Sequence, residues 1–306
     1  MDAARIDGAA LRVSYDASRR LHARHGRTFY LATRLLPPAK RPHVHALYGF
    51  ARWADDLVDT AGVSTARARL DRLRAELDHD SPASSPAVAA LRDTVRRFGL
   101  PRQHLSDFLD AMESDLRITG YPTYTDLCEY MWGSAAVIGL LVLPVLGTAD
   151  GVEESGAAPY AAKLGIAFQL TNFIRDVGED LARGRIYLPE EDLARYGVDR
   201  DRLARGIADG PIRNLLSFEI ERAREIYAAA RPGIAMLHPQ SRDCVEAACC
   251  LYSRILDAVE RADYDVLRRR VSVPGWRRAA VGAPAWLRAQ RAQRAQRTRR
   301  RRASRS

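Results

Sequence analysis

Four polar side chains near residue 50 are spaced so that a helix would place them in one row. They are Tyr48, Arg52, Asp55 and Asp59. Because an α-helix has about 3.6 residues per turn, residues three and four apart share a face. Asp56 flanks the row, and most of the other residues in this stretch are apolar, which indicates a helix packed on most sides. Acids and an arginine inside such a helix point to a binding or catalytic function.

A second row of polar residues follows later in the chain. Its members are Gln169, Asn172, Asp176 and Asp180, with spacings of three, four and four. These spacings again keep the side chains on one helix face, with a slow drift around the axis. Apolar residues such as Phe168, Phe173 and Ile174 surround them. The second helix is therefore also expected to be largely buried.

Together, the two rows predict metal-assisted chemistry on a diphosphate. Acids four residues apart repel by roughly 0.2–0.5 kcal/mol even when exposed, and by more when desolvated. A cation relieves this repulsion, and an all-oxygen ligand set suits Mg²⁺, with Mn²⁺ as a second candidate. Arg52 and Arg175 are placed to contact the diphosphate directly. Either row alone is equally compatible with a solvated surface, whereas the pair favours a site.

Apolar residues recur at intervals of three and four along most of the chain, and strand patterns are scarce. The protein is therefore expected to be all-α, and no linker suggests a second globular domain. The predicted helices cover residues 8–24, 39–60, 64–78, 86–98, 102–118, 124–146, 155–181, 211–236 and 240–267. Turn signals such as Gly99-Leu100-Pro101 separate them.

The net charge of +10 is concentrated at the C-terminus. Residues 288–306 hold nine arginines and no acid, which leaves about +1 for the rest of the chain. This composition predicts a disordered basic tail over residues 276–306. Arginines near an anionic leaflet contribute on the order of 1 kcal/mol each, so we expect peripheral membrane contact. The tail has no nucleic-acid-reading motif, and no specific nucleic-acid partner is expected.

Three further observations favour a cytoplasmic protein, and with the basic tail they lead us to expect a position peripheral to the inner face of the plasma membrane. The four cysteines have neither metal-site spacing nor the density of a disulfide scaffold. The N-terminus lacks the basic-then-apolar order of a secretory signal. The longest apolar run, Ala135–Leu146, has twelve residues, whereas a membrane span needs about 18 or more.

The sequence also resembles the squalene/phytoene synthase family of head-to-head prenyl transferases. The matching pair of motifs is DDLVD at Asp55–Asp59 and NFIRDVGED at Asn172–Asp180. The resemblance continues through HGRTFYLATRLLPPAKRPHVHALYGFARWADD near the N-terminus, YMWGSAAVIGL at Tyr130–Leu140, RGRIYLP after the second motif and ADYDVLRRRV near the end of the core. It spans roughly residues 15–275.

This resemblance implies one isoprenoid synthase domain over residues 15–275, with a central pocket between helices, after an N-terminal segment of residues 1–14. The implied metal ligands are Asp55, Asp59, Asn172, Asp176 and Asp180. The implied catalytic residues are Tyr48, Arg52, Arg175 and Tyr187, and the implied substrate-binding residues are Asp56, Gln169, Thr28 and Tyr252. Gly26 departs from the pattern, because some relatives have Ser there. A family arginine near the end of the core matches Arg268, Arg269 or Arg270.

The implied reaction condenses two geranylgeranyl diphosphates to phytoene through prephytoene diphosphate, in carotenoid biosynthesis, without NADPH. The alternative is a squalene or dehydrosqualene synthase that uses farnesyl diphosphate. The depth of the pocket determines which of the two substrates fits, and the sequence does not locate the pocket floor. A scaffold protein that had lost the chemistry would have no reason to retain all five implied metal ligands. The near-neutral body argues against a nucleic-acid-binding protein.

Overall fold

The computed structural model describes residues 1–60, 62–78 and 83–273, without the side chains of residues 59, 60 and 78. Two features predicted from the sequence therefore lie outside the described residues. They are the side chain of Asp59 and the basic tail over residues 276–306.

The described residues form an all-helical structure in which no strand is present. The α-helices are α1 (Ala9–His25), α2 (Arg27–Thr33), α3 (Arg41–Thr60), α4 (Val63–Asp78), α5 (Pro86–Phe98), α6 (Arg102–Ser114), α7 (Tyr124–Met131), α8 (Val137–Leu146), α9 (Glu154–Ala182), α10 (Glu190–Arg195), α11 (Arg200–Ala204), α12 (Gly210–Ala230), α13 (Pro232–Met236) and α14 (Pro239–Arg261). A short 3₁₀-helix covers Asp2–Ala4, and a π-helical segment covers Trp132–Ala136. The predicted all-α class is confirmed.

Most predicted helices are present, and their ends follow local signals. Helix α5 begins where Ser85 accepts a hydrogen bond from the backbone of Val88, and it ends at Gly99 in the left-handed conformation. The helix predicted over 102–118 stops at Ser114, and the one predicted over 240–267 stops at Arg261. Pro232 divides the helix predicted over 211–236, because proline lacks the backbone N–H that would continue it.

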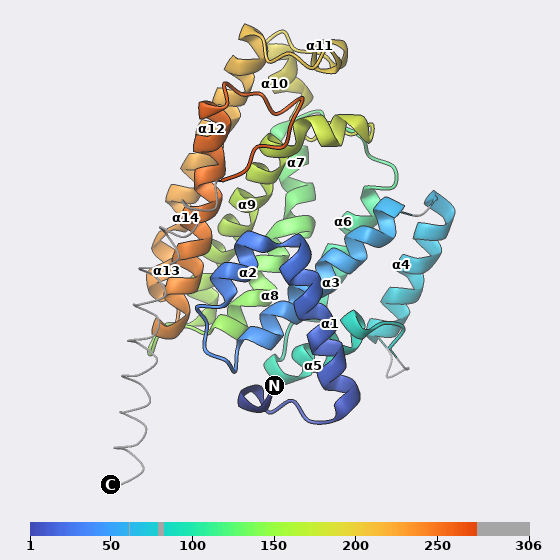
Figure 1. The fold of residues 1–306 in the computed structure, drawn as a ribbon, viewed down its shortest axis with the longest axis vertical. Helices are drawn as coiled ribbons and strands as arrows, with labels where there is room; N and C mark the ends of the chain where they lie inside the picture. The colour runs from blue at the N-terminus through green and yellow to red at the C-terminus, as the bar shows by residue number, and fades with distance from the viewer. Residues whose placement is uncertain (61, 79–82, 274–306) are drawn as a thin grey trace.

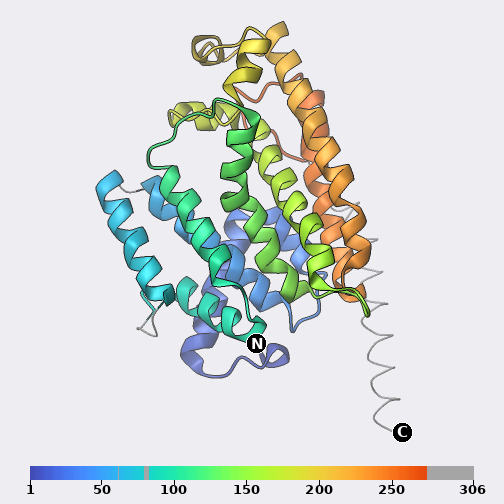
Figure 2. The same cartoon turned by 180° about the vertical axis from the view of Figure 1, so that it is seen from behind.

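Helix α9 lies at the centre of the molecule (Figures 1 and 2). It packs against α8, α12, α13, α14 and the π segment, while α3 packs against α1, α5 and α8. Helix α14 also covers α2. The two helices that carry the acidic rows, α3 and α9, are therefore both held by α8.

Glycines allow α8 and α9 to approach closely. A Cβ at Gly139 of α8 would clash with the carbonyl oxygen of Ala161 on α9, and one at Gly165 of α9 would clash with that of Ala135 in the π segment that continues into α8. No side chain fits at either position while the helices keep this separation. The spacing between these two backbones therefore depends on the two glycines.

The segment Tyr124–Leu146, which combines α7, the π segment and α8, is long and apolar enough by composition to cross a membrane. More than half of its most apolar part is buried inside the fold. Core helices of folded proteins have the same composition, so this segment is weak evidence for a membrane span.

The N-terminal residues pack onto the helical body. Ile6 is fully buried and belongs to a small cluster with Tyr15 and Ala46. The boundary expected between residues 14 and 15 lies inside α1.

We predict that Gly139→Val lowers the free energy of unfolding by about 2–3 kcal/mol, because α8 and α9 must separate to admit the side chain. Thermal unfolding followed by circular dichroism measures the change. The control is Gly210→Ala at the start of α12, where a Cβ would meet nothing within 4 Å. Equal melting temperatures for both variants and the wild type would contradict the close α8–α9 contact.

Candidate active site

The first acidic row lies on α3, where one arginine bridges two acids. Arg52 donates from Nη1 to Asp55 Oδ2 at 2.9 Å and from Nη2 to Asp56 Oδ1 at 2.5 Å. All three side chains are half-buried. The arginine thus offsets the repulsion between neighbouring carboxylates that the sequence predicted.

The second row lies on α9 and is neutralised from two elements. Arg175 donates to both carboxylate oxygens of Asp176, at 2.7 and 2.5 Å, and Arg270 donates to Asp176 at 3.0 Å. Of the three arginines left open by the sequence, only Arg270 reaches this row. Arg268 binds the carbonyl of Gly206 instead, and Arg269 pairs with Asp265.

Asp180 is the most perturbed acid of the second row. Burial raises the pKa of its carboxyl to about 7, with a further contribution from the negative charge of Asp176. Arg183 and Arg185 oppose this rise. A carboxyl that is this reluctant to ionise in isolation favours a nearby cation.

The two rows are electrostatically coupled across the site. Burial raises the pKa of Tyr48 on α3, and Tyr252 of α14 raises it further, whereas Arg52 and Arg175 oppose the rise. Arg175 of α9 in turn forms a hydrogen bond with Tyr252. The side chains of Tyr48, Arg175 and Tyr252 therefore lie near one another, although they come from three different helices.

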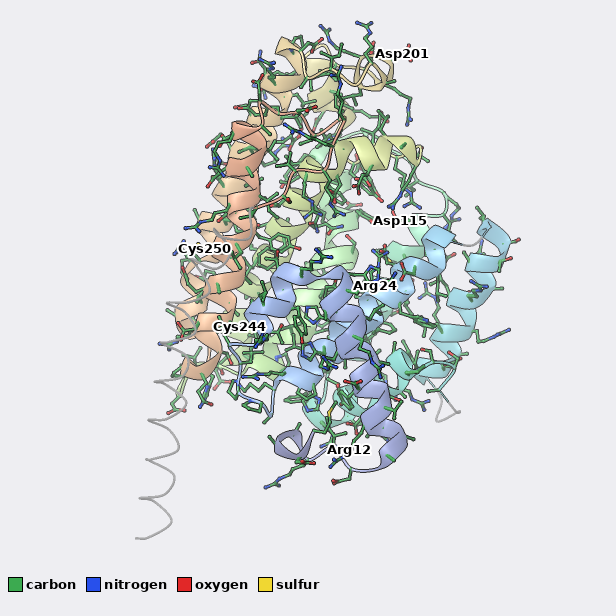
Figure 3. The ribbon with its side chains drawn as sticks, viewed as in Figure 1. Arg12, Arg24, Asp115, Asp201, Cys244 and Cys250 are labelled. Atoms are coloured by element: carbon green, nitrogen blue, oxygen red, sulfur yellow. The ribbon has the colours of Figure 1, made fainter. Side chains whose placement is uncertain are left out.

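An apolar cavity of about 310 Å³ begins at the N-terminal members of the two rows. Tyr48, Gln169 and Asn172 line it, and the acids lie one to three turns further along the same helices. Most of the other lining residues are apolar and come from α2, α3, α8, α9, α13, α14 and the π segment. Figure 3 labels Cys244, which lines the cavity, and Asp115 at the end of α6.

Aromatic rings form part of the cavity wall. Phe29 of α2 stacks on Tyr252 with ring centroids 4.3 Å apart, and Phe168 of α9 lies 4.9 Å from the same ring. Phe29 and Phe168 both line the cavity. Aromatic faces attract positive charge without attacking it chemically.

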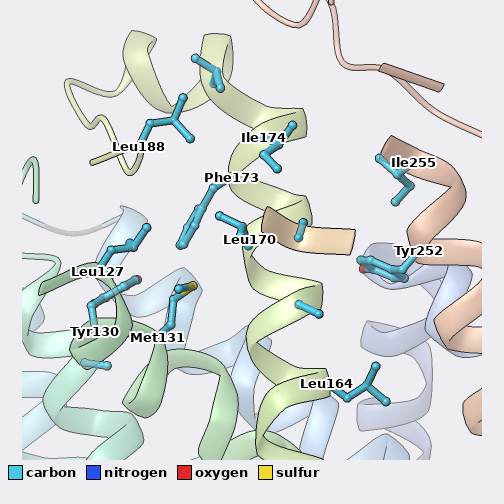
Figure 4. Packing of buried hydrophobic residues seen from close by; sticks show 14 of the residues in the cluster. Leu127, Tyr130, Met131, Leu164, Leu170, Phe173, Ile174, Leu188, Tyr252 and Ile255 are labelled. Atoms are coloured by element: carbon cyan, nitrogen blue, oxygen red, sulfur yellow. The ribbon is translucent and has the colours of Figure 1, made fainter. Parts of the chain in front are cut away.

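Tyr187 follows α9 and lies on the side of that helix opposite Tyr252. It contacts Asp115, a residue that the sequence patterns do not mark. Its hydroxyl donates to Asp115 Oδ1 at 3.3 Å, and the hydroxyl of Tyr130 donates to Asp115 Oδ2 at 2.8 Å. Tyr187 also stacks on Phe173 at 4.1 Å. Figure 4 shows Tyr130 and Phe173 on one side of α9 and Tyr252 on the other.

Asp115 links the two acidic rows. Burial raises the pKa of its carboxyl to about 7; Asp55 of the first row also raises it, whereas the hydrogen bond from Tyr130 and the charge of Arg185 lower it. Arg185, which follows the second row, donates to the backbone carbonyl of Asp115 at 3.2 Å. Asp115 caps the C-terminal end of α6 and is not at helical spacing from a second motif residue, so the sequence patterns did not mark it.

The remaining predicted residues are placed as follows. Gln169 accepts a weak hydrogen bond from Asn172 at 3.4 Å. Thr28 is half-buried in the first turn of α2, immediately before Phe29 of the cavity wall. Gly26 separates α1 from α2, and a Cβ there would lie 2.5–2.6 Å from ring atoms of Tyr48. Serine does not fit at residue 26 while Tyr48 lies in this position.

The donor set fits a hard divalent cation. The acids of both rows supply only oxygen atoms, and the amide oxygen of Asn172 is buried with no hydrogen-bond partner among the described residues. In the same part of the chain, no three Asp, Glu, His or Cys side chains are arranged to hold a metal ion unaided. Mg²⁺ usually takes one or two carboxylates and completes its coordination with water and substrate phosphate. The residues therefore suit a Mg²⁺ site that a diphosphate completes.

Comparison with known proteins identifies the family. The family model for squalene/phytoene synthase matches residues 22–277. The chain belongs to the squalene/phytoene synthase family. Squalene/phytoene synthases of known structure share the fold: a dehydrosqualene synthase matches with a TM-score of 0.82 and 28% identity over 90% of this chain and 96% of that one. A squalene synthase from Alicyclobacillus acidocaldarius matches with a TM-score of 0.74 and 30% identity over 84% of this chain and 97% of that one.

Within the squalene/phytoene synthase family, the chain is similar to cyanobacterial members. The phytoene synthase of Arthrospira platensis is 40% identical, over 90% of this chain and 94% of that protein. The 15-cis-phytoene synthase of Synechococcus elongatus is 37% identical, over 92% of this chain and 95% of that protein. The family resemblance and the fold class expected from the sequence are both confirmed.

We predict that Asp115→Asn stabilises the protein at pH 8. The folded-state pKa of Asp115 is raised from 3.8 to about 7, so wild-type stability from this group is full below pH 4 and is lost as pH rises through 7. Removing the charge should add about 1 kcal/mol at pH 8, or roughly 2–4 °C in Tm. The gain should shrink as pH falls towards 4.

Thermal unfolding in metal-free buffer across this pH range measures the effect of Asp115→Asn. Asp71→Asn, at an exposed position on α4, is the matched control. If Asp115→Asn were less stable at pH 8 than at pH 4 relative to wild type, the buried environment assigned to Asp115 would be wrong.

Proposed function

We propose that the protein joins two molecules of geranylgeranyl diphosphate head to head to give phytoene, through prephytoene diphosphate and with release of two diphosphates. Relatives at 37–40% identity over about 90% of the chain are phytoene synthases, which supports a place in carotenoid biosynthesis. The observation that carries the proposal is the approach of two acid-bearing helices at the polar end of an apolar cavity.

The site residues divide into proposed metal ligands and proposed contacts to the diphosphate. Asp55, Asp59, Asn172, Asp176 and Asp180 are the proposed metal ligands, and Asp59 is included on sequence alone. When bound there, Mg²⁺ or Mn²⁺ would supply the positive charge that stabilises a departing diphosphate. No NADPH is expected, because the last cation on the way to phytoene loses a proton and gains no hydride.

Two arginines, Arg52 and Arg175, are proposed to bind the substrate diphosphate in addition to the acids that they contact in the structure. Arg52 and Arg175 neutralise acids in the structure, at 2.5–2.9 Å. A diphosphate between the rows would compete for these donors, since charge-assisted bonds from arginine to phosphate are among the strongest in proteins. Asp56, Gln169 and Thr28 are the proposed neighbouring substrate contacts.

The cavity holds the two hydrocarbon chains away from water. Its lining includes few polar groups, and Tyr48, Phe29 and Phe168 present aromatic faces to it. Tyr252 and Tyr187 are proposed to border the reacting centre from opposite sides of α9. Exclusion of water matters because a carbocation would otherwise be quenched as an alcohol.

The cellular site of the reaction is a separate proposal. The apolar substrate and product favour a cytoplasmic enzyme that touches the inner face of the membrane. The basic tail over residues 276–306 is the proposed contact, on the strength of its nine arginines between residues 288 and 306.

We predict that Asp55→Ala and Asp176→Ala each lower kcat by about 10³-fold or more while leaving the helical content unchanged. Each variant is incubated with Mg²⁺ and geranylgeranyl diphosphate, and diphosphate and hydrocarbon are quantified. Wild-type protein with a chelator should also lose activity. Asp71→Ala on α4 is the matched control, and near-normal rates for either site variant would show that the metal site lies elsewhere.

We predict that Ala157→Phe shifts the substrate preference from geranylgeranyl towards farnesyl diphosphate, by about 10-fold or more in the ratio of kcat/KM values. Ala157 lines the cavity fifteen residues before Asn172 on α9, or about 22 Å at 1.5 Å per residue. A larger side chain there shortens the space for the longer chain.

Competition between the two diphosphates, with product identification in the presence and absence of NADPH, measures the preference of the Ala157→Phe variant. Ala204→Phe, at an exposed position on α11, is the control. A wild-type protein that prefers farnesyl diphosphate would overturn the choice of substrate and leave the metal chemistry intact.

A further inference from the structure

Tyr48 is held in a slot between α1 and the turn that follows it. Its ring stacks on the imidazole of His22, with centroids 4.0 Å apart and planes 11° apart. On another side, the absent Cβ of Gly26 leaves room that ring atoms of Tyr48 occupy. The orientation of Tyr48 at the cavity therefore depends on His22.

His22 is itself held by a second histidine. Its Nδ1 lies 2.9 Å from Nδ1 of His45 on α3, one turn before Tyr48. The two side chains are 0% and 5% exposed. His45 in turn stacks on Tyr30 of α2, at 5.4 Å and 28°. The pair thus ties α1 and α2 to α3 beside the cavity.

A contact between two Nδ1 atoms constrains the protons on both rings. One ring must carry its proton on Nδ1 and donate, and the other must carry its proton on Nε2 and accept through Nδ1. Two identical tautomers would leave either two protons or two lone pairs facing each other at 2.9 Å. The geometry therefore requires opposite tautomers of two neutral rings, or one ring charged.

The surroundings disfavour a charged ring. Burial lowers the pKa of His22 to about 2, with a contribution from His45, and lowers that of His45 to about 4, with contributions from Arg19 and Arg41. The rings of Tyr48 and Tyr30 stack on His22 and His45, so aromatic faces cover this side of the pair. His22 Nε2 is also buried, and it has no hydrogen-bond partner among the described residues.

We propose that His22 and His45 are positioning residues that share one proton between their Nδ1 atoms and thereby hold Tyr48 at the polar end of the cavity. Neither residue touches the diphosphate or the metal in this role. The shared proton locks the plane of the His22 ring, and that plane orients Tyr48 by stacking. Gly26 also contributes to this arrangement, because a side chain at residue 26 would occupy the space of the Tyr48 ring.

The tautomers are tested directly by NMR on protein labelled with ¹⁵N-histidine, using His22→Phe and His45→Phe to assign the two rings. The expected spectrum has one ring protonated on Nδ1 and the other on Nε2, with both rings neutral from pH 8 to pH 5. Two rings of the same tautomer, or a ring that titrates near pH 6.5, would overturn the proposal.

The pair also predicts a pH dependence of stability. In the unfolded chain, each imidazole takes up a proton as pH falls below about 6.5, whereas the folded pair resists until lower pH. The stability that the pair provides is therefore lost as pH falls from 6.5 towards 4. A His22→Phe, His45→Phe double variant should lose less stability over this range than the wild type, and an equal loss would contradict the neutral pair.

The kinetic test rests on the role proposed for Tyr48. His22→Ala, which removes the stacking face, is expected to lower kcat for geranylgeranyl diphosphate about 10-fold, with a smaller change in KM. His22→Phe, which keeps an aromatic face, should recover part of this loss when combined with His45→Phe. His104→Phe on α6 is the control histidine variant.

The outcomes separate the two proposals. If Tyr48→Ala retained full activity, the proposed role of Tyr48 would fail, while the tautomer measurement would still decide the histidine pair. If Tyr48→Ala were inactive but His22→Ala had wild-type kcat and KM, the positioning role would be overturned and the proposed function would stand.

Discussion

The repulsion between neighbouring carboxylates within each of two rows is the constraint on which the rest of this structure depends. Within each row, on α3 and on α9, acids at helical spacing raise each other's free energy. Arginines reduce this cost: Arg52 serves the first row, and Arg175 with Arg270 serves the second. The compensation is incomplete, since burial and Asp176 still raise the pKa of Asp180 to about 7. The site is thus built to receive positive charge.

The helices around α3 and α9 keep the rows at a fixed distance. Gly139 and Gly165 let α8 and the π segment approach α9 closely, and α8 also packs against α3. Asp115 lies near Asp55 of the first row and accepts hydrogen bonds from Tyr130, Tyr187 and Arg185, the last two of which follow the second row. The same α8–α9 wall, continued by the π segment, lines the apolar cavity. One set of contacts therefore supports both the polar end, where a diphosphate would leave, and the apolar space, where its hydrocarbon chains would lie.

Sequence patterns located the long helices because each spans several turns, and periodicity needs several turns to be recognised. The short helices α2, α10 and α11 were missed for the opposite reason, since five to seven residues hold too few repeats. The sequence predicts continuous α-helix through Trp132–Ala136, where the structure has a π segment, because a π turn leaves no distinct pattern in five residues. The arginine near the end of the core could not be chosen by spacing, as three in succession fit equally well. A single hydrogen bond from Arg270 to Asp176 separates it from its neighbours.

The sequence by itself determined the all-helical class and the two acidic rows, because residue type and helical spacing carry that information locally, and from these rows it predicts metal-diphosphate chemistry. Only the tertiary structure decided which groups meet across the site. Asp115 and the His22–His45 pair have no periodic signal in the sequence. The position of Asp115 depends on contacts between the end of α6, α7 and the chain after α9, and the histidine pair depends on the contact between α1 and α3. The same holds for Gly26, whose missing side chain is explained by the ring of Tyr48. Such contacts join residues far apart in the chain, and packing in three dimensions is what brings them together.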